Sequence, residues 1–269
     1  LPQASAHQMI DWALLCGSLL LTIAVWWGAT GIIAWLIGRS VDSYPTLLRG
    51  TLVLGVIALA AVLATRNLQS VAGAALAFLG AIGIWAGIEV SFLTGRVTGL
   101  PPRAEATPTA HGWRHAIEAV RVILWHELLI IGVVVVVAGM TIDADNRVAL
   151  GTLLLLWLMR SSAKINLFLG VRNLGEAFLP QHLAHLLRYM QHRRMNFLFP
   201  FSIALGSAIV WLLGTRALQA ESGFAASGYA ILATLAALAV LEHILMVLPL
   251  QSERFWRWSL ANRQGASRP

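Results

Sequence analysis

The sequence has little of what soluble and secreted proteins rely on. It contains one cysteine, Cys16, among 269 residues, so an intramolecular disulfide is excluded. Charged residues amount to only 12%, about half the fraction usual in soluble domains. Hydrophobic residues, in contrast, make up 58% of the chain. The scarcity of charge therefore predicts an all-α polytopic membrane protein that contacts the lipid bilayer.

Seven apolar runs approach or exceed the length of about 20 residues that crosses a bilayer. They cover residues 12–37, 48–65, 71–93, 117–140, 148–168, 197–214 and 227–250. The sequence thus predicts a single transmembrane domain over residues 1–269, built as a bundle of about seven helices. In the fifth connection, between the predicted helices 148–168 and 197–214, Pro180 opens a segment with an apolar stripe and a basic, histidine-rich side. We expect residues 180–192 to form an amphipathic helix on the cytoplasmic membrane surface.

Basic residues are distributed unevenly between the predicted connections. The formal net charge is +7, which in a soluble protein would suggest a nucleic-acid partner. Here only Arg66, Arg147 and Arg216 fall on one side of the predicted membrane, and the other 16 of the 19 basic residues fall on the opposite side. Because lysine and arginine accumulate in cytoplasmic loops, this asymmetry predicts an N-terminus outside, a C-terminus inside and no nucleic-acid partner.

The predicted helix 148–168 carries two cations in an otherwise apolar run. Arg160 and Lys164 are four residues apart and share one helical face. Charge inside a membrane is costly, so such residues meet headgroup water or carboxylates from other helices. Other predicted helices supply three glutamates and two adjoining histidines, which are Glu89, His126, Glu127, Glu242 and His243. The predicted topology places all seven in the cytoplasmic half of the membrane, which indicates one shared polar site.

Three interpretations of this site stay open. The first is a salt-bridge cluster that fixes helix packing, in which we expect Arg160 to pair with Glu127 or Glu242. The second is a metal or tetrapyrrole site, because neutral histidine is a good axial ligand for magnesium or iron and carboxylates bind hard cations. The metal-ligand candidates are His126, Glu127, Glu242 and His243. The third is a proton or ion path. The residue four after His126 is Ile130, so the zinc-protease motif HExxH is absent, and no catalytic residue is assigned.

Small residues recur along the predicted helix 71–93, at Gly73, Ala77, Gly80, Gly83 and Gly87. Residues without bulky side chains at helical spacing let a second helix approach closely. We therefore expect another helix to pack tightly against this one.

Several of these segments also occur together in a known family. They include Val71-Ala-Gly73-Ala-Ala-Leu-Ala-Phe78, Glu89-Val-Ser-Phe-Leu-Thr-Gly95, His126-Glu127-Leu, Trp157-Leu-Met-Arg160-Ser-Ser-Ala-Lys164-Ile-Asn166, Phe168-Leu-Gly170-Val-Arg172-Asn173-Leu-Gly-Glu176 and Leu241-Glu242-His243. The chain resembles the PuhE-type photosynthetic complex assembly proteins of purple phototrophic bacteria. The resemblance covers most of the chain from residue 71 onward. The family is encoded near the reaction-centre H subunit and brings no catalytic residues to transfer.

The resemblance implies an integral membrane factor for assembly of the photosynthetic reaction centre and light-harvesting complex. It implies an inner, intracytoplasmic membrane location. In that membrane the orientation predicted from the basic residues puts the N-terminus in the periplasm and the C-terminus in the cytoplasm. Reaction-centre or light-harvesting subunits would be the protein partners. The site Glu89, His126, Glu127, Glu242 and His243 would hold bacteriochlorophyll, another tetrapyrrole or a partner helix, with Arg160 and Lys164 forming an ion-pair network. The alternative is an intramembrane metal-dependent enzyme acting on a pigment or quinone precursor, although a non-enzymatic role is favoured.

Overall fold

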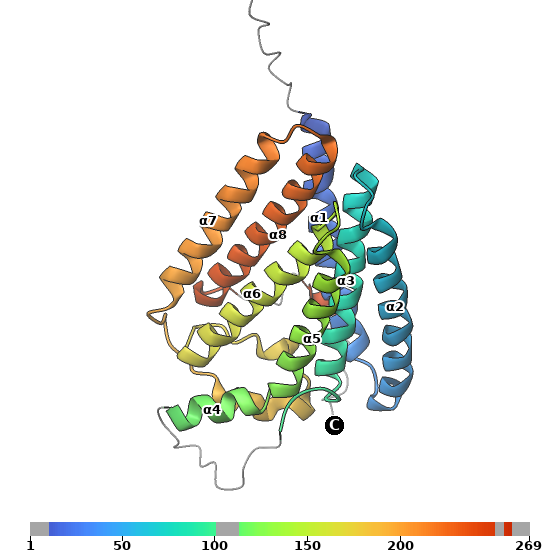
Figure 1. The fold of residues 1–269 in the computed structure, drawn as a ribbon. Helices are drawn as coiled ribbons and strands as arrows, with labels where there is room; N and C mark the ends of the chain where they lie inside the picture. Colours follow the sequence, from blue (N-terminus) through green and yellow to red (C-terminus); the bar gives the residue numbers. More distant parts are fainter. Residues whose placement is uncertain (1–10, 101–112, 251–255, 260–269) are drawn as a thin grey trace, which may run out of the picture.

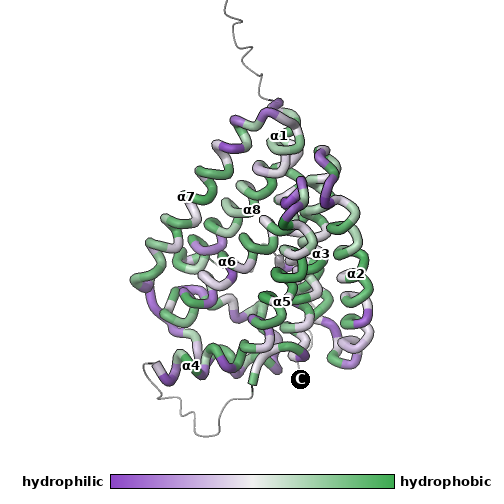
Figure 2. The backbone as a smooth tube through the Cα atoms, in the orientation of Figure 1, coloured by the Kyte–Doolittle hydropathy of each residue, from purple (hydrophilic) through white to green (hydrophobic). Residues whose placement is uncertain are grey.

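Helices account for all the regular structure that is described. The computed structural model describes residues 11–100, 113–250 and 256–259, and these residues contain no strand. The elements are α1 (Trp12–Ile37), η1 (Val41–Ser43), α2 (Tyr44–Thr65), α3 (Val71–Leu93), α4 (Trp113–Arg121), α5 (Leu124–Thr141), α6 (Val148–Leu169), η2 (Glu176–Phe178), η3 (Gln181–Tyr189), α7 (Phe199–Leu218) and α8 (Gly223–Val247). Every α-helix except α4 is long and apolar enough to cross a membrane, which makes seven. The predicted all-α membrane bundle is confirmed, and Figure 2 shows that hydrophobic residues dominate the middles of these helices.

Successive spanning helices alternate in direction. α1, α3, α6 and α8 run one way through the bundle, and α2, α5 and α7 run the other way (Figure 1). The start of α1 and the end of α8 therefore lie at opposite ends of the bundle. The short helix α4 lies across one of these ends, which is called the α4 end below.

The central helix is α3. A larger share of it is buried than of any other spanning helix, and it contacts α1, α2, α5, α6 and α8. It begins after Ser70, whose side chain accepts a hydrogen bond from the backbone N–H of Gly73 and so caps the first turn. Because α3 is enclosed by its neighbours, Glu89 near its end is forced into the protein interior.

The glycine-rich face of α3 packs directly on α2. A Cβ atom at Gly80 would lie 3.0 Å from the carbonyl oxygen of Ala58, and one at Gly83 would lie 3.0 Å from the Ala58 Cβ. A Cβ atom at Gly87 would lie 3.6 Å from the carbonyl oxygen of Thr51. Larger side chains at Gly80 and Gly83 would push the two helices apart. The close approach predicted from the residue spacing is therefore confirmed, with α2 as the partner.

The region predicted as one helix over 117–140 is two helices in the structure. α4 ends at Arg121 and α5 begins at Leu124, with Ile123 outside the helical conformation at φ −120° and ψ 7°. The preceding loop inserts at this break, because the N–H of His126 donates to the carbonyl oxygen of Thr98 at 2.9 Å. That bond satisfies one of the free N–H groups in the first turn of α5. The polar residues of α4 are thus taken out of the spanning helix and laid across the bundle end.

The segment predicted as an amphipathic helix at 180–192 forms η3, a 3-10 helix over Gln181–Tyr189. Its apolar stripe faces inward, with Leu183, Leu186 and Tyr189 buried against Val122. Burial raises the pKa of the Tyr189 phenol above its ordinary value. The segment therefore closes the α4 end by packing on the protein.

Three other spans differ from prediction by a few residues. α2 begins at Tyr44 instead of residue 48, α7 ends at Leu218 instead of residue 214, and α8 begins at Gly223 instead of residue 227. Pro45 lies in the first turn of α2, and Ser222 caps α8 by accepting a hydrogen bond from the N–H of Ala225. Capping residues thus extend the helices beyond their most apolar parts.

Candidate functional site

The candidate site is built around the last three turns of α6. Residues two apart on an α-helix point about 200° apart, so Arg160 and Lys164 lie nearly opposite Ser162 and Asn166. α6 is followed by its C-cap residue Gly170, which adopts φ +112°, a conformation that residues other than glycine rarely adopt. A Cβ atom there would lie 2.7 Å from Cγ of Arg193, so the end of α6 needs glycine for both reasons.

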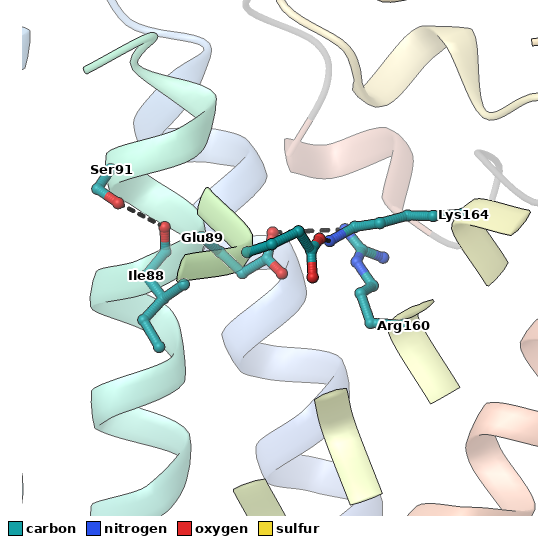
Figure 3. Close-up of polar contacts among 6 residues, drawn as sticks. Ile88, Glu89, Ser91, Arg160 and Lys164 are labelled. Atoms are coloured by element: carbon teal, nitrogen blue, oxygen red, sulfur yellow. Dashed lines mark hydrogen bonds and ion pairs between the residues drawn. The ribbon is translucent and has the colours of Figure 1, made fainter. Parts of the chain in front are cut away.

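Arg160 pairs with Glu89 of α3. Its Nη2 donates to Oε2 of Glu89 at 3.4 Å, and Figure 3 shows Arg160 and Lys164 reaching from α6 toward Glu89. The predicted partners of Arg160, Glu127 and Glu242, are therefore wrong. The reason is that α3 is the central helix and packs on α6, which helical periodicity alone does not reveal. The side chain of Glu89 is only 8% exposed, whereas that of Arg160 is 49% exposed.

Lys164 pairs with Glu127 of α5. The distance from Nζ of Lys164 to Oε1 of Glu127 is 2.5 Å, and both side chains are mostly buried. Glu127 lies in the first turn of α5, next to the helix break, and Lys164 lies one turn beyond Arg160 on α6. The two ion pairs thus fasten α6 to α3 and to α5 on a single face.

Glu242 stands apart from both pairs. Within the described residues it has no cation within 4 Å, and its carboxylate instead interacts with the indole of Trp26 on α1. Its side chain is partly buried at the end of α8. The structure therefore brings four of the five predicted charged residues into pairs and leaves Glu242 outside them.

The two histidines have different surroundings. His243 is 2% exposed, and both ring nitrogens have partners: Nδ1 lies 2.8 Å from the carbonyl oxygen of Ala239 and Nε2 lies 3.0 Å from Oγ of Ser162. The carbonyl can only accept, so Nδ1 carries the proton and Nε2 is the acceptor. His126 is 1% exposed and packs on Phe92 with ring centroids 4.5 Å apart. Its Nδ1 has no hydrogen-bond partner among the described residues.

The opposite face of α6 carries a neutral hydrogen-bond network that sequence reasoning did not identify. Nδ2 of Asn166 donates to Oγ of Ser202 on α7 at 2.9 Å, and Oγ of Ser162 lies 3.1 Å from the same atom. Asn196 donates from Nδ2 to the carbonyl oxygens of Asn166 and Gly170 and to Oδ1 of Asn166. The signal that was available is the pair of polar residues, Ser162 and Asn166, four apart inside an apolar helix.

A cavity of about 460 Å³ lies beside the charged face of α6. The charged residues that line it are Glu89, Arg160, Lys164 and Glu242. Most of the remaining wall is apolar, with aromatic side chains from Trp26, Trp85, Phe92, Phe178 and Trp256. His126 and His243 are not among the lining residues.

Trp256 closes part of this wall. Its ring lies 5.6 Å from that of Trp26 and 5.6 Å from that of Phe178, edge to face in both cases. Its indole N–H donates to the carbonyl oxygen of Trp27 at 3.4 Å. The described residues 256–259 therefore pack against α1 beside the cavity.

The described residues do not bring the metal-ligand candidates together. Within 11–100, 113–250 and 256–259, no group of three or more histidine, cysteine, aspartate and glutamate side chains is placed to hold a metal ion. What the arrangement offers chemically is an apolar, aromatic cavity whose lining includes a guanidinium, an ammonium and two carboxylates.

Comparison with known proteins identifies relatives but no structural precedent. The family model described as "Protein of unknown function (DUF3623)" matches residues 13–267. The chain is 38% identical over 253 residues to a protein of Rhodobacter capsulatus, and the match covers 90% of this chain and 89% of the relative. That relative is described as an uncharacterized 30.4 kDa protein in the puhA 5′ region. No solved structure matches the chain.

Proposed function

The chain belongs to the DUF3623 family, and from this premise we propose that it is an assembly factor for the bacterial photosynthetic reaction centre and light-harvesting complex. The location of the Rhodobacter capsulatus relative in the puhA 5′ region supports a role connected with the photosynthetic apparatus. The protein works within the membrane and is expected to contact reaction-centre or light-harvesting subunits.

The observation that carries the proposal furthest is the cavity beside α6. Its volume of about 460 Å³ falls in the range of small-molecule sites. Its lining is mostly apolar and aromatic, with Glu89, Arg160, Lys164 and Glu242 as the charged members. This lining supports a bacteriochlorophyll-type pigment as the occupant. Of the proposed site residues, Glu89 and Glu242 line the cavity, whereas Glu127, His126 and His243 lie outside its lining.

The proposed location is the inner, intracytoplasmic membrane with the N-terminus in the periplasm. The uneven distribution of the 19 basic residues supports this orientation. It puts the α4 end, and with it the charged residues of α6, on the cytoplasmic side. No observation favours the enzymatic alternative over this role.

Deletion of the relative's gene in Rhodobacter capsulatus tests the proposal. Membranes from the deletion strain should contain fewer assembled reaction-centre and light-harvesting complexes per milligram of protein, measured from their near-infrared absorption bands. Expression of the present chain should restore them, and respiratory growth in the dark serves as the control. Unchanged levels of both complexes in the deletion strain would refute the assembly role.

A further inference from the structure

One of the two ion pairs beside the cavity is incompletely satisfied within the described residues. Oε2 of Glu89 is bonded to Arg160, but Oε1 is buried and has no hydrogen-bond partner among the described residues. A buried carboxylate oxygen without a donor costs free energy, so the pair of Glu89 with Arg160 is incompletely satisfied where it borders the cavity.

Arg160 has unused donors on the same wall. A guanidinium has five N–H groups, and within the described residues Arg160 uses one, toward Glu89. Its side chain is 49% exposed although it belongs to a spanning helix, and it lines the cavity. Arg160 therefore offers charge-assisted hydrogen bonds to an acceptor inside the cavity.

The histidines do not fit the role of axial ligand for a pigment in this cavity. Neither His126 nor His243 lines it. Nε2 of His243 is occupied by Ser162, and Nδ1 carries the proton directed at Ala239. A pigment held in the cavity would have to be recognised by groups other than imidazole.

We propose that the cavity binds a planar apolar molecule through a carbonyl or carboxylate oxygen that accepts hydrogen bonds from Arg160, without a bond between histidine and a metal. The aromatic walls formed by Trp26, Trp85 and Trp256 suit a flat ring system. The inference rests on the proposed function for its choice of pigment, and it replaces metal ligation with recognition of a peripheral oxygen.

Binding of two pigments to the purified full chain in detergent tests the inference. Bacteriochlorophyll and magnesium-free bacteriopheophytin share their peripheral carbonyl groups and differ in the metal. Their dissociation constants, measured from quenching of tryptophan fluorescence, should agree within about threefold. Arg160→Lys keeps the charge but loses the planar fork of donors, and it should weaken both by about 10-fold, the equivalent of about 1.4 kcal/mol. Arg194→Lys, at an exposed position away from the cavity lining, is the matched control.

Each outcome supports or overturns the inference. Equal binding of both pigments, with loss in Arg160→Lys, supports it, as does a ring carbonyl stretching frequency that rises in that variant. Binding of bacteriochlorophyll alone, abolished by His126→Ala or His243→Ala, overturns it in favour of axial ligation. Binding of neither pigment also overturns it, and the deletion strain described above then shows whether the assembly role stands by itself. The comparison of the two pigments uses the unsubstituted protein, so its outcome does not depend on whether any variant folds.

Discussion

The two faces of α6 solve the problem of polar residues in a membrane in different ways. The face with Ser162 and Asn166 meets α7 and α8 through neutral groups that satisfy one another. The face with Arg160 and Lys164 meets α3 and α5 through two ion pairs, and here Oε1 of Glu89 and Nδ1 of His126 have no partner in the described part of the chain. A closed network stabilises packing, whereas an incompletely satisfied one beside a cavity is suited to receive a ligand.

The contrast teaches that similar residues need not have similar roles. His126 and His243 each adjoin a glutamate in sequence, and both are almost completely buried. Among the described residues, both ring nitrogens of His243 have partners, so it belongs to the network of Ser162 and Asn166, whereas His126 packs beside the ion pairs with Nδ1 unpartnered. Substitutions at the two histidines therefore test how much each face of α6 contributes to stability.

The largest loss of stability should follow Asn196→Ala. Nδ2 of Asn196 bonds three acceptors at the end of α6, and Oδ1 accepts from the N–H groups of Leu198 and Phe199, which starts α7. Leaving several buried groups unpaired should lower the free energy of unfolding by about 3–5 kcal/mol. The thermal midpoint in detergent measures the effect, and Asn67→Ala at an exposed position is the control. Equal midpoints in the two variants would show that this face is not the structural one.

Arg160→Ala should cost less, about 2–3 kcal/mol. Removing Arg160 leaves the buried negative charge of Glu89 uncompensated. The cost is moderated because the arginine side chain is half exposed in the intact pair. The second change Glu89→Ala should restore the amount of protein in the membrane, because it removes the stranded carboxylate. Glu127→Ala in the same Arg160→Ala background should not restore it. If Glu127→Ala restored the amount of protein in the Arg160→Ala background and Glu89→Ala did not, Arg160 would be paired with Glu127 instead of Glu89.

Replacing each histidine by phenylalanine should have smaller effects on the free energy of unfolding, and the effects should differ between the two faces of α6. His243→Phe removes the acceptor of Ser162 and should cost about 1–3 kcal/mol. His126→Phe removes Nδ1, which has no hydrogen-bond partner in the described part of the chain, at a position that already packs on Phe92. It should change the unfolding free energy by less than about 1 kcal/mol. Thermal unfolding in detergent compares the two variants directly. An equally large cost at both positions would indicate that Nδ1 of His126 is bonded to a water molecule or a ligand.

Hydropathy and charge spacing were sufficient to predict the spanning helices and the gathering of charge around α6. They could not identify Glu89 as the partner of Arg160, because periodicity defines the face of a helix and not the neighbour packed against it. The break before α5 was missed because residues 117–140 are predominantly apolar, and the break depends on a bond to the distant residue Thr98. The difference between the histidines likewise depends on Ser162, which lies 81 residues from His243 in sequence.

The smallest perturbation tests where the two faces lie in the membrane. In a Cys16→Ser background, Arg66→Cys and Arg194→Cys place single thiols at exposed positions, one after α2 and one before α7. Both positions lie outside the spanning helices, so neither change should alter stability by more than about 0.5 kcal/mol. A membrane-impermeant thiol reagent added to intact cells should label the Arg66→Cys variant, while the Arg194→Cys variant should react only after the membrane is opened.

This labelling result would put both faces of α6 in the cytoplasmic half, because Arg160 and Lys164 lie toward the end of α6 that leads to residue 194. The reverse labelling pattern would place the charged face and its cavity on the periplasmic side, where the positive-inside argument does not allow them.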